Sequence, residues 1–247
     1  MITAVILAKN EQKNLQELIP TLSFCDEVIV VDNDSSDGTS EIAKKLGARI
    51  LHSSSTRFSE LRTLASKAAR NPWILHIDAD ERISSKLQSE ISEVIQSGKH
   101  QAYSIPRIDM FWGKPVKYGE TLEARLKGII RLVQSDAGHW IGDVHEVFTS
   151  KKSVGKLHNH IRHFSHKGIE DFLVTVNIFS TKRAEELYKN GIRLWGIHII
   201  FPPLMKFFYT FFILGGFLDG ARGFVYSFMM SFHSFLSRSK LYLLQNK

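Results

Sequence analysis

The stretch WILHIDADERI, residues 73–83, decides the fold, because a run that reads as a buried strand ends on the acidic residues of DADE (78–81). Carboxylates at the end of such a run are typical of a site at the carboxyl edge of an α/β sheet. On an extended chain Asp78 and Asp80 point the same way. Two carboxylates so placed suit Mg²⁺ or Mn²⁺, which prefer oxygen ligands and often share them with a diphosphate. The alternative is a solvated loop that caps the next helix.

Strands and helices alternate on both sides of this stretch. Strands are predicted over 3–8, 27–33, 48–52 and 73–78, and helices over 11–19, 36–47, 59–70 and 84–98. This alternation with short connections predicts an α/β fold with a mostly parallel sheet and flanking helices, in which ligands bind beyond the carboxyl ends of the strands. Asp32 ends the second strand at such a position. Asn10 and Glu11 follow the first strand, where they could instead cap the next helix.

The chain changes character after residue 100. Strands with few helices between them are predicted over 102–113, 128–134, 143–150 and 156–166, and a long amphipathic helix over 169–191. The aromatic segment 197–218 has about the length of a membrane-spanning helix. Its two prolines, Lys206 and a Gly-Gly pair favour helices that lie in the membrane interface or enter one leaflet instead.

Charge and composition narrow the possible partners. Residues 151–247 hold 14 Lys and Arg against 5 Asp and Glu, whereas the whole chain has 32 against 25. Among so many aromatic residues, this basic excess favours an anionic membrane surface over nucleic acid. A buried helical hairpin with solvated charges is the alternative. The single cysteine, Cys25, excludes an internal disulfide, and the N-terminus reads as a first strand rather than a signal peptide.

Together these features resemble the family 2 glycosyltransferases of the GT-A fold. The resemblance is carried by AVILAKNEQKNL (4–15), DEVIVVDNDSSDGTSEIAKKLGARIL (26–51), LRTLASKAARNPWILHIDADERI (61–83), VHEVF (144–148) and GGFLDGARGF (215–224). The subgroup that looks most similar is that of the lipopolysaccharide-core β-glycosyltransferases of the WaaE/KdtX type. We accordingly expect a Rossmann-like GT-A domain over 1–166, which binds the nucleotide sugar and carries catalysis. A C-terminal region of amphipathic and aromatic helices over 167–247 would associate with a membrane.

The resemblance also implies roles for individual residues in the donor site. Asn10 and Glu11 would line the nucleotide pocket, Asp32 and Asp78 would contact the uracil or ribose, and Arg62 matches an arginine of the subgroup. Asp80 would bind the Mg²⁺ or Mn²⁺ that bridges the diphosphate, with His163 as a further metal ligand. Thr63 departs from the subgroup, which has asparagine after this arginine. His163 could instead be a strand histidine hydrogen-bonded in the core or at the surface.

Inverting transfer needs a base at the acceptor hydroxyl and stabilisation of the departing nucleotide diphosphate. The metal at Asp80 would supply the stabilisation. We expect Glu146 to be the base, with Asp143 as the next candidate, and His145 to orient the acceptor or line the site. Glu146 could instead be an exposed strand residue.

The expected function is therefore metal-dependent, inverting transfer of a sugar, from a UDP-sugar or another nucleotide sugar, to a lipid-linked or lipopolysaccharide-core acceptor. The protein would lie at the cytoplasmic face of the cell membrane as a peripheral or monotopic enzyme, and nucleic acid is not an expected partner. The alternatives are a polyprenyl-phosphate sugar transferase, a non-catalytic membrane-bound scaffold, or a receiver-type phosphotransfer domain. A receiver-type domain would not account for the strands predicted after residue 100 or for the aromatic segment. The cations expected at anionic headgroups are Lys182, Arg183, Lys189, Lys206, Arg222, Arg238 and Lys240.

Overall fold

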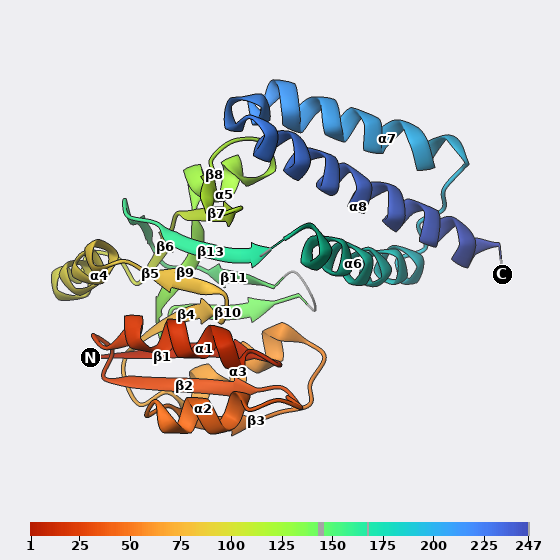
Figure 1. The fold of residues 1–247 in the computed structure, drawn as a ribbon. Coiled ribbons are helices and arrows are strands. Elements are labelled where there is room, and N and C mark those ends of the chain that lie inside the picture. Colours follow the sequence, from red (N-terminus) through yellow and green to blue (C-terminus); the bar gives the residue numbers. More distant parts are fainter. Residues whose placement is uncertain (143–145, 167, 247) are drawn as a thin grey trace. The chain divides into compact units, whose positions relative to one another are not determined.

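The computed structural model describes residues 1–142, 146–166 and 168–246. By their contacts the residues form two compact units, Met1–Arg107 with Ala124–His163, and Ile108–Glu123 with Phe164–Lys247. The first unit contains the main sheet, and the second contains the long C-terminal helices (Figure 1). Residues 108–123 group with those helices. The division into functional domains over 1–166 and 167–247 stays a prediction.

Within the described residues, the first unit is built on a seven-stranded sheet with the order β12-β6-β9-β4-β1-β2-β3. Its strands are β1 (Ile2–Ala8), β2 (Glu27–Asp32), β3 (Arg49–His52), β4 (Trp73–Asp78), β6 (Ala102–Ile105), β9 (Ile129–Gln134) and β12 (Val154–Lys156). Strands β1 to β4 are parallel, and β9 runs antiparallel between β4 and β6. The predicted α/β fold with a mostly parallel sheet is therefore confirmed.

Strand β1 shows why the sheet is buried on both faces. Ala4 and Ile6 pack into one core with helices α1 (Gln12–Leu18), α2 (Thr39–Lys45) and α4 (Ser85–Ser97). Val5 packs into a second core with helix α3 (Phe58–Ala68) and the hairpin of β10 (Gly138–Ile141) and β11 (Val147–Ser150). Since side chains alternate along a strand, a strand covered on both faces needs a continuous apolar run.

The helix limits follow local capping. Helix α4 begins after Ser84, whose Oγ accepts the N–H of Leu87 at 3.3 Å, and ends at Gly98 with φ of +59°. The helix predicted over 36–47 begins only at Thr39. The carboxylate of Asp37 accepts the N–H of Thr39 at 3.0 Å, which holds the preceding residues in a loop.

The remaining elements of the first unit are short. They are the 3₁₀ turn η1 (Ile19–Leu22), strand β5 (Glu81–Ile83), the larger part of helix α5 (Leu122–Lys127) and the first part of β13 (Ile161–His166). Strand β5 pairs antiparallel with β13, so that Glu81 lies opposite His163. This pairing brings the end of β4 next to a strand that is distant in sequence.

The second unit packs three helices on a small hairpin. The hairpin joins β7 (Arg107–Phe111) to β8 (Lys114–Val116), and the helices are α6 (Ile169–Lys189), α7 (Ile197–Phe208) and α8 (Ala221–Gln245). Helix α8 lies along both α6 and α7 (Figure 1). The core of this unit contains Phe111, Val116, Phe172, Val176, Tyr226 and Met229. Among the described residues, every helix is too short or too polar to span a bilayer.

A tight connection joins α7 to α8 through the π-helical turn η3 (Tyr209–Ile213) and the 3₁₀ turn η4 (Gly216–Asp219). The buried carboxylate of Asp219 accepts the N–H groups of Lys117 and Tyr118 at 2.7 and 2.8 Å. A Cβ atom at Gly223 would lie 1.8 Å from the carbonyl oxygen of Gly216. The segment GGFLDGARGF, noted in the sequence, therefore forms a closely packed connection.

We expect Gly223→Ala to lower the free energy of unfolding by about 1–3 kcal/mol, because the added methyl group meets backbone that has to move. Gly196→Ala is the matched control, since a Cβ there has nothing within 4 Å. Urea unfolding followed by circular dichroism measures both variants. Equal midpoints for the two variants would contradict the tight packing of the connection.

Candidate active site

The carboxyl ends of three neighbouring strands lie in register. Ala8 of β1 pairs with Asp32 of β2, and Leu7 of β1 pairs with Asp78 of β4. Asn10 and Glu11 follow β1 at the same edge. Residues predicted from three separate sequence segments therefore meet where parallel α/β sheets bind ligands.

Asn10 and Glu11 connect the loop after β1 to the loop after β2. Asn10 has a left-handed backbone with φ of +58°. Its side-chain oxygen accepts the N–H of Ser36 at 2.8 Å. The N–H of Asn10 donates to the hydroxyl of Ser35 at 2.9 Å, and the N–H of Glu11 donates to Thr39 Oγ1 at 2.8 Å. These bonds fix the shape of the rim, and contact with a nucleotide stays a prediction.

Asp32 is buried and held within its own loop. Its carboxylate accepts the N–H of Ser35 at 3.1 Å and the hydroxyl of Ser40. Burial alone would raise the pKa of Asp32, but the hydrogen bonds from Ser35 and Ser40 lower it below its usual value. Asp32 therefore presents a carboxylate at the strand end. Its predicted contact with uracil or ribose is not tested by these bonds.

Two buried arginines hold Asp78. Arg62 of α3, which is 2% exposed, donates from Nη2 to Asp78 Oδ1 at 2.7 Å, and Arg131 of β9 donates to Asp78 Oδ2. Burial alone would raise the pKa of Asp78, but the charges of Arg131 and Arg62 and their hydrogen bonds hold it far below its usual value. Asp78 is thus ionised across the physiological pH range.

Arg62 also holds Glu146. Its Nε donates to Glu146 Oε1 at 2.7 Å, across 84 positions of sequence, and the Glu146 side chain is mostly buried. The guanidinium lies over the ring of Trp140, 4.8 Å from its centroid. Arg62 Nη1 has no hydrogen-bond partner among the residues that the structure describes. Arg62 therefore links the predicted base to Asp78.

Asp80 and His163 form a second pair, with Oδ2 and Nε2 separated by 3.3 Å. Adjacent ligands of an octahedral Mg²⁺ lie about 3 Å apart when each bond is about 2.1 Å long, so this pair fits two positions around such an ion. Over 1–142, 146–166 and 168–246, no group of three or more His, Cys, Asp or Glu residues is arranged to hold a metal. The further ligands would be diphosphate oxygens and water.

The structure thus joins Arg62, Asp78 and Glu146 in one network and pairs Asp80 with His163. Asp143 and His145 lie outside the described residues. The roles assigned to all of these residues stay predictions.

Sequence reasoning missed Arg131, and it counted Glu81 among the strand-end carboxylates without assigning it a role. Glu81 is fully buried, accepts the N–H of Asp78 at 2.9 Å and lies 3.4 Å from Arg131. Burial and the charge of Asp78 raise the pKa of Glu81, although Arg131 opposes this shift. Arg131 is the single charged residue of the predicted strand GIIRLVQ (128–134). A lone charge inside an apolar strand was the available signal, because arginine is rarely buried unless it is paired.

His76 lies buried beside this network. The indole Nε1–H of Trp140 donates to His76 Nε2 at 3.3 Å, so this nitrogen is the acceptor and the neutral ring carries its proton on Nδ1. Burial, together with the charges of Arg62 and Arg131, holds the pKa of His76 well below its usual value.

We expect the free energy of unfolding to fall between about pH 7 and about pH 5, by up to roughly 1.4 kcal/mol per pH unit from His76. Unfolded His76 gains a proton near pH 6.5 but folded His76 does not, so the unfolded chain binds more protons and stability rises with pH. His76→Gln should reduce this slope. His139→Gln, which changes an exposed histidine of β10, is the matched control. Urea unfolding at several pH values measures the slopes, and equal slopes for both variants would rule out the effect.

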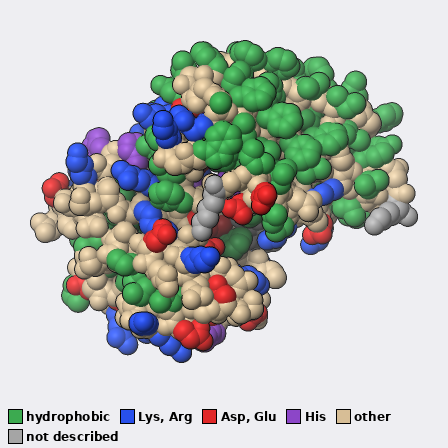
Figure 2. Space-filling model, in the orientation of Figure 1, with side chains coloured by type: hydrophobic (Ala, Val, Ile, Leu, Met, Phe, Trp, Pro, Cys, Tyr) green, Lys and Arg blue, Asp and Glu red, His purple; other side chains and the backbone are tan. Residues whose placement is uncertain are grey.

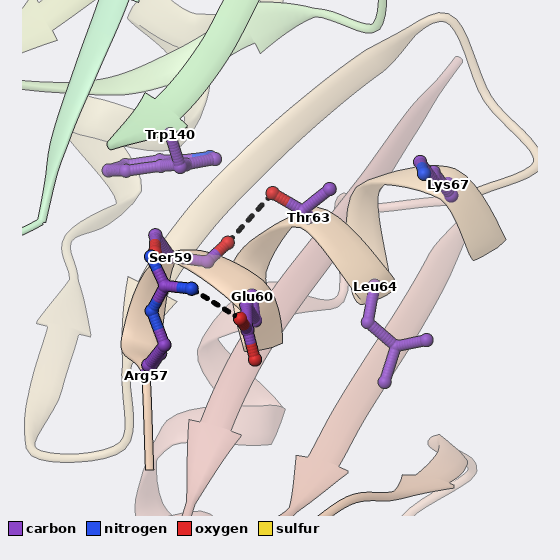
Figure 3. A pocket seen from close by; sticks show the side chains of 7 residues that line it. All are labelled: Arg57, Ser59, Glu60, Thr63, Leu64, Lys67 and Trp140. Carbon is purple, nitrogen blue, oxygen red and sulfur yellow. Dashed lines mark hydrogen bonds and ion pairs between the residues drawn. The ribbon is translucent and has the colours of Figure 1, made fainter. Parts of the chain in front are cut away.

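A pocket of about 390 Å³ opens beside α3. Figure 3 shows Trp140 of β10 facing the helix, Arg57 paired with Glu60, and the hydroxyl of Thr63 directed at Ser59, to whose carbonyl it donates. The lining residues are Arg57, Ser59, Glu60, Thr63, Leu64, Lys67 and Trp140. None of the residues assigned to the site above lines this pocket. Trp140 is the lining residue that also contacts the Arg62 guanidinium, which holds Asp78.

Comparison with protein families and curated proteins gives consistent matches. The family model described as "Glycosyl transferase family 2" matches residues 3–157. A Rickettsia typhi protein named "Uncharacterized glycosyltransferase RT0209" is 32% identical over 97% of this chain and 86% of its own length. "Lipopolysaccharide core biosynthesis glycosyltransferase LpsC" of Rhizobium meliloti is 26% identical over 98% of this chain and 92% of its own length.

Solved structures share the fold at low sequence identity. Staphylococcus aureus TarS 1-349 in complex with UDP-GlcNAc has a TM-score of 0.53 and 15% identity, over 98% of this chain and 88% of that one. Glucosyl-3-phosphoglycerate synthase from Mycobacterium tuberculosis, in complex with Mn²⁺, UDP and glucosyl-3-phosphoglycerate, has a TM-score of 0.51 and 16% identity, over 79% of this chain and 82% of that one. The predicted GT-A architecture is confirmed.

Proposed function

This chain belongs to glycosyl transferase family 2, and we propose that it transfers a sugar from a UDP-sugar to an acceptor hydroxyl with inversion at the anomeric carbon. The observation that carries the proposal is the link from Glu146 through Arg62 to Asp78 at the end of β4. Two proteins of the same fold were solved with UDP or UDP-GlcNAc, one of them with Mn²⁺. These complexes support the choice of a UDP donor and a divalent cation.

Each side chain has a separate task in the proposed reaction. Glu146 accepts the proton of the attacking hydroxyl on Oε2, while Arg62 holds Oε1 and so fixes the direction of the carboxylate. Asp78, ionised by its arginines, accepts a hydrogen bond from the uracil or ribose on a remaining lone pair. A divalent cation on Asp80 and His163 would neutralise charge on the departing UDP.

The remaining residues would shape the two sides of the site. Asn10, Glu11 and Asp32 would line the nucleotide pocket at the edge of β1 and β2. Asp143 stays the alternative candidate for the base, and His145 stays the candidate for orienting the acceptor. The donor would thus lie over the parallel strands, with Glu146 approaching it from the acceptor side.

We propose a lipid-linked glycan of the lipopolysaccharide-core type as the acceptor, and the WaaE/KdtX type as the subgroup. The similarity to LpsC over nearly the whole chain supports this choice. An enzyme with such an acceptor would work at the membrane surface, as a peripheral or monotopic protein on the cytoplasmic face.

The proposal is tested by calorimetry and by a transfer assay. UDP is titrated into the protein with and without Mn²⁺, and UDP-sugars are then supplied with membrane extract as acceptor. We expect UDP binding that requires the metal, and release of UDP coupled to sugar transfer with the opposite anomeric configuration in the product. Absence of UDP binding in both conditions would overturn the donor assignment. Binding without transfer would instead indicate a scaffold that kept the fold.

A further inference from the structure

We propose that α7, η3 and the start of α8 form a face that lies in the interface of a lipid bilayer, held by burial of apolar side chains rather than by cations at anionic headgroups. The proposal deepens the proposed function and rests on it for the choice of a lipid acceptor. It also replaces the mode of attachment that the basic composition predicts.

The outer side of α7 and η3 is apolar and open to solvent. Ile197, Ile200, Leu204, Phe208 and Ile213 are between 52% and 73% exposed, and their spacing follows one side of a helix. The same surface includes Phe201, Met205, Tyr209, Phe212, Phe217, Leu218, Phe224 and Phe228, each about half exposed. Figure 2 shows hydrophobic side chains gathered over this region. Apolar patches of this kind on soluble monomers mark sites of interaction.

This apolar face carries almost no charge. Across 195–228 the Asp, Glu, Lys and Arg residues are Lys206, Asp219 and Arg222. Lys206 Nζ lies 2.9 Å from Glu120 Oε1, and Asp219 is buried with its carboxylate accepting two backbone N–H groups. A charge that is neutralised by a partner within the unit is a weak ligand for a headgroup. The exposed apolar face is thus poorly suited to electrostatic attachment to headgroups.

Two further cations assigned to headgroups from the sequence are engaged inside the unit. Lys240 Nζ donates to the carbonyl of Asn177 at 2.7 Å and to Ser180 Oγ at 2.8 Å, which ties α8 to α6. Arg238 donates to Ser234 Oγ at 2.7 Å on its own helix. Some of the basic residues therefore hold the helices of this unit together. Composition alone cannot tell such residues from those that would contact headgroups.

Polar groups at the helix breaks turn inward. The carbonyl of Pro203 accepts the hydroxyl of Ser231 at 2.6 Å, and the carbonyl of Leu214 accepts the N–H of Gly119 at 3.0 Å. Backbone groups in a bilayer need partners within the protein, whereas groups facing water do not. These two carbonyl groups at the breaks of the helix therefore have hydrogen-bond partners within the protein, as an apolar environment requires.

The side-chain chemistry favours lipid over a second protein surface. A protein interface carries roughly one hydrogen bond per 100–200 Å², and the Ile, Leu, Phe and Met side chains of this face offer no donor or acceptor of that kind. Trp195, which is 77% exposed, and Arg193 lie just before α7. Aromatic and basic residues that border an apolar face are typical of a membrane interface.

The test is flotation of the full chain with lipid vesicles. Vesicles of phosphatidylcholine alone, and of phosphatidylcholine with phosphatidylglycerol, are used at about 0.1 M and about 1 M NaCl, which shortens the Debye length from about 10 Å to about 3 Å. We expect binding to neutral vesicles that persists at high salt. Leu204→Glu with Phe208→Glu should reduce vesicle binding at least about ten-fold, because each carboxylate would enter the apolar layer. Val174→Glu on α6, also at an exposed apolar position, is the matched control and should bind as the native chain does.

Two results would overturn the proposal. Binding only to anionic vesicles, lost at high salt, would show electrostatic attachment. Absence of vesicle binding together with a dimer in sedimentation, broken by the double variant, would assign the face to a second copy. UDP titration of the same samples separates the two proposals: vesicle binding without UDP binding would remove the transferase function and leave the bilayer face standing.

Discussion

Asp80→Ala is expected to abolish metal-dependent binding of UDP, lowering the affinity measured with Mn²⁺ by at least about 100-fold, or roughly 2.7 kcal/mol. The variant removes the only carboxylate of the Asp80–His163 pair, and a neutral imidazole alone compensates little of the cation's charge. Transfer should be lost with binding, since the leaving diphosphate would be unshielded.

Asp136→Ala is the matched control for Asp80→Ala. Asp136 is an exposed carboxylate that pairs with Lys152 at the surface. It follows β9, whose end lies beside Trp73 at the start of β4, so it is at the edge of the sheet opposite Asp78. Calorimetry with UDP and Mn²⁺, then with UDP alone, measures both variants. If Asp80→Ala keeps the metal requirement and the affinity of the native chain, Asp80 does not bind the cation.

Arg62→Ala is expected to lower the free energy of unfolding by about 3–5 kcal/mol, because it removes a buried cation that is paired with the mostly buried Glu146 and the partly buried Asp78. Asp78 would keep only Arg131, and Glu146 would lose the guanidinium that fixes its Oε1. Transfer should fall as well, since the proposed base loses its orientation. Urea unfolding gives the stability, and the rate of UDP release gives the activity.

Two variants control this prediction. Arg57→Ala removes an exposed arginine that directly precedes α3 and pairs with exposed Glu60, and should change stability by less than about 0.5 kcal/mol. Arg62→Lys keeps the charge but not the planar fork that reaches two carboxylates, so it should restore only part of the loss. An Arg62→Ala variant as stable as Arg57→Ala would show that the network adds little.

The sequence was sufficient for features that depend on local pattern. The apolar runs that became β1, β2 and β4 predicted a buried parallel sheet, and the capping residues around 84–98 predicted α4 to within one residue at each end. The strand-end positions of Asp32 and Asp78 followed from the same pattern, since carboxyl ends of parallel strands share an edge.

Contacts between charged residues that are distant in the chain could not be predicted from the sequence. Arg131 pairs with Asp78 only because β9 enters the sheet antiparallel beside β4, a topology that strand periodicity does not give. Likewise, Lys206 and Lys240 looked like free cations until Glu120 and the side of α6 were placed against them. Periodicity shows which face of an element is buried but not which charged group lies opposite.

One guanidinium between two carboxylates has a consequence for engineering. Because Arg62 contacts both Asp78 and Glu146, neutralising either one strengthens the hold of Arg62 on the other, and the energetic effects of the two changes will not add. Under the proposed roles, a change at Asp78 aimed at the donor would therefore also affect Glu146, the proposed base on the acceptor side. Variation of specificity is better begun at positions that do not touch this shared cation.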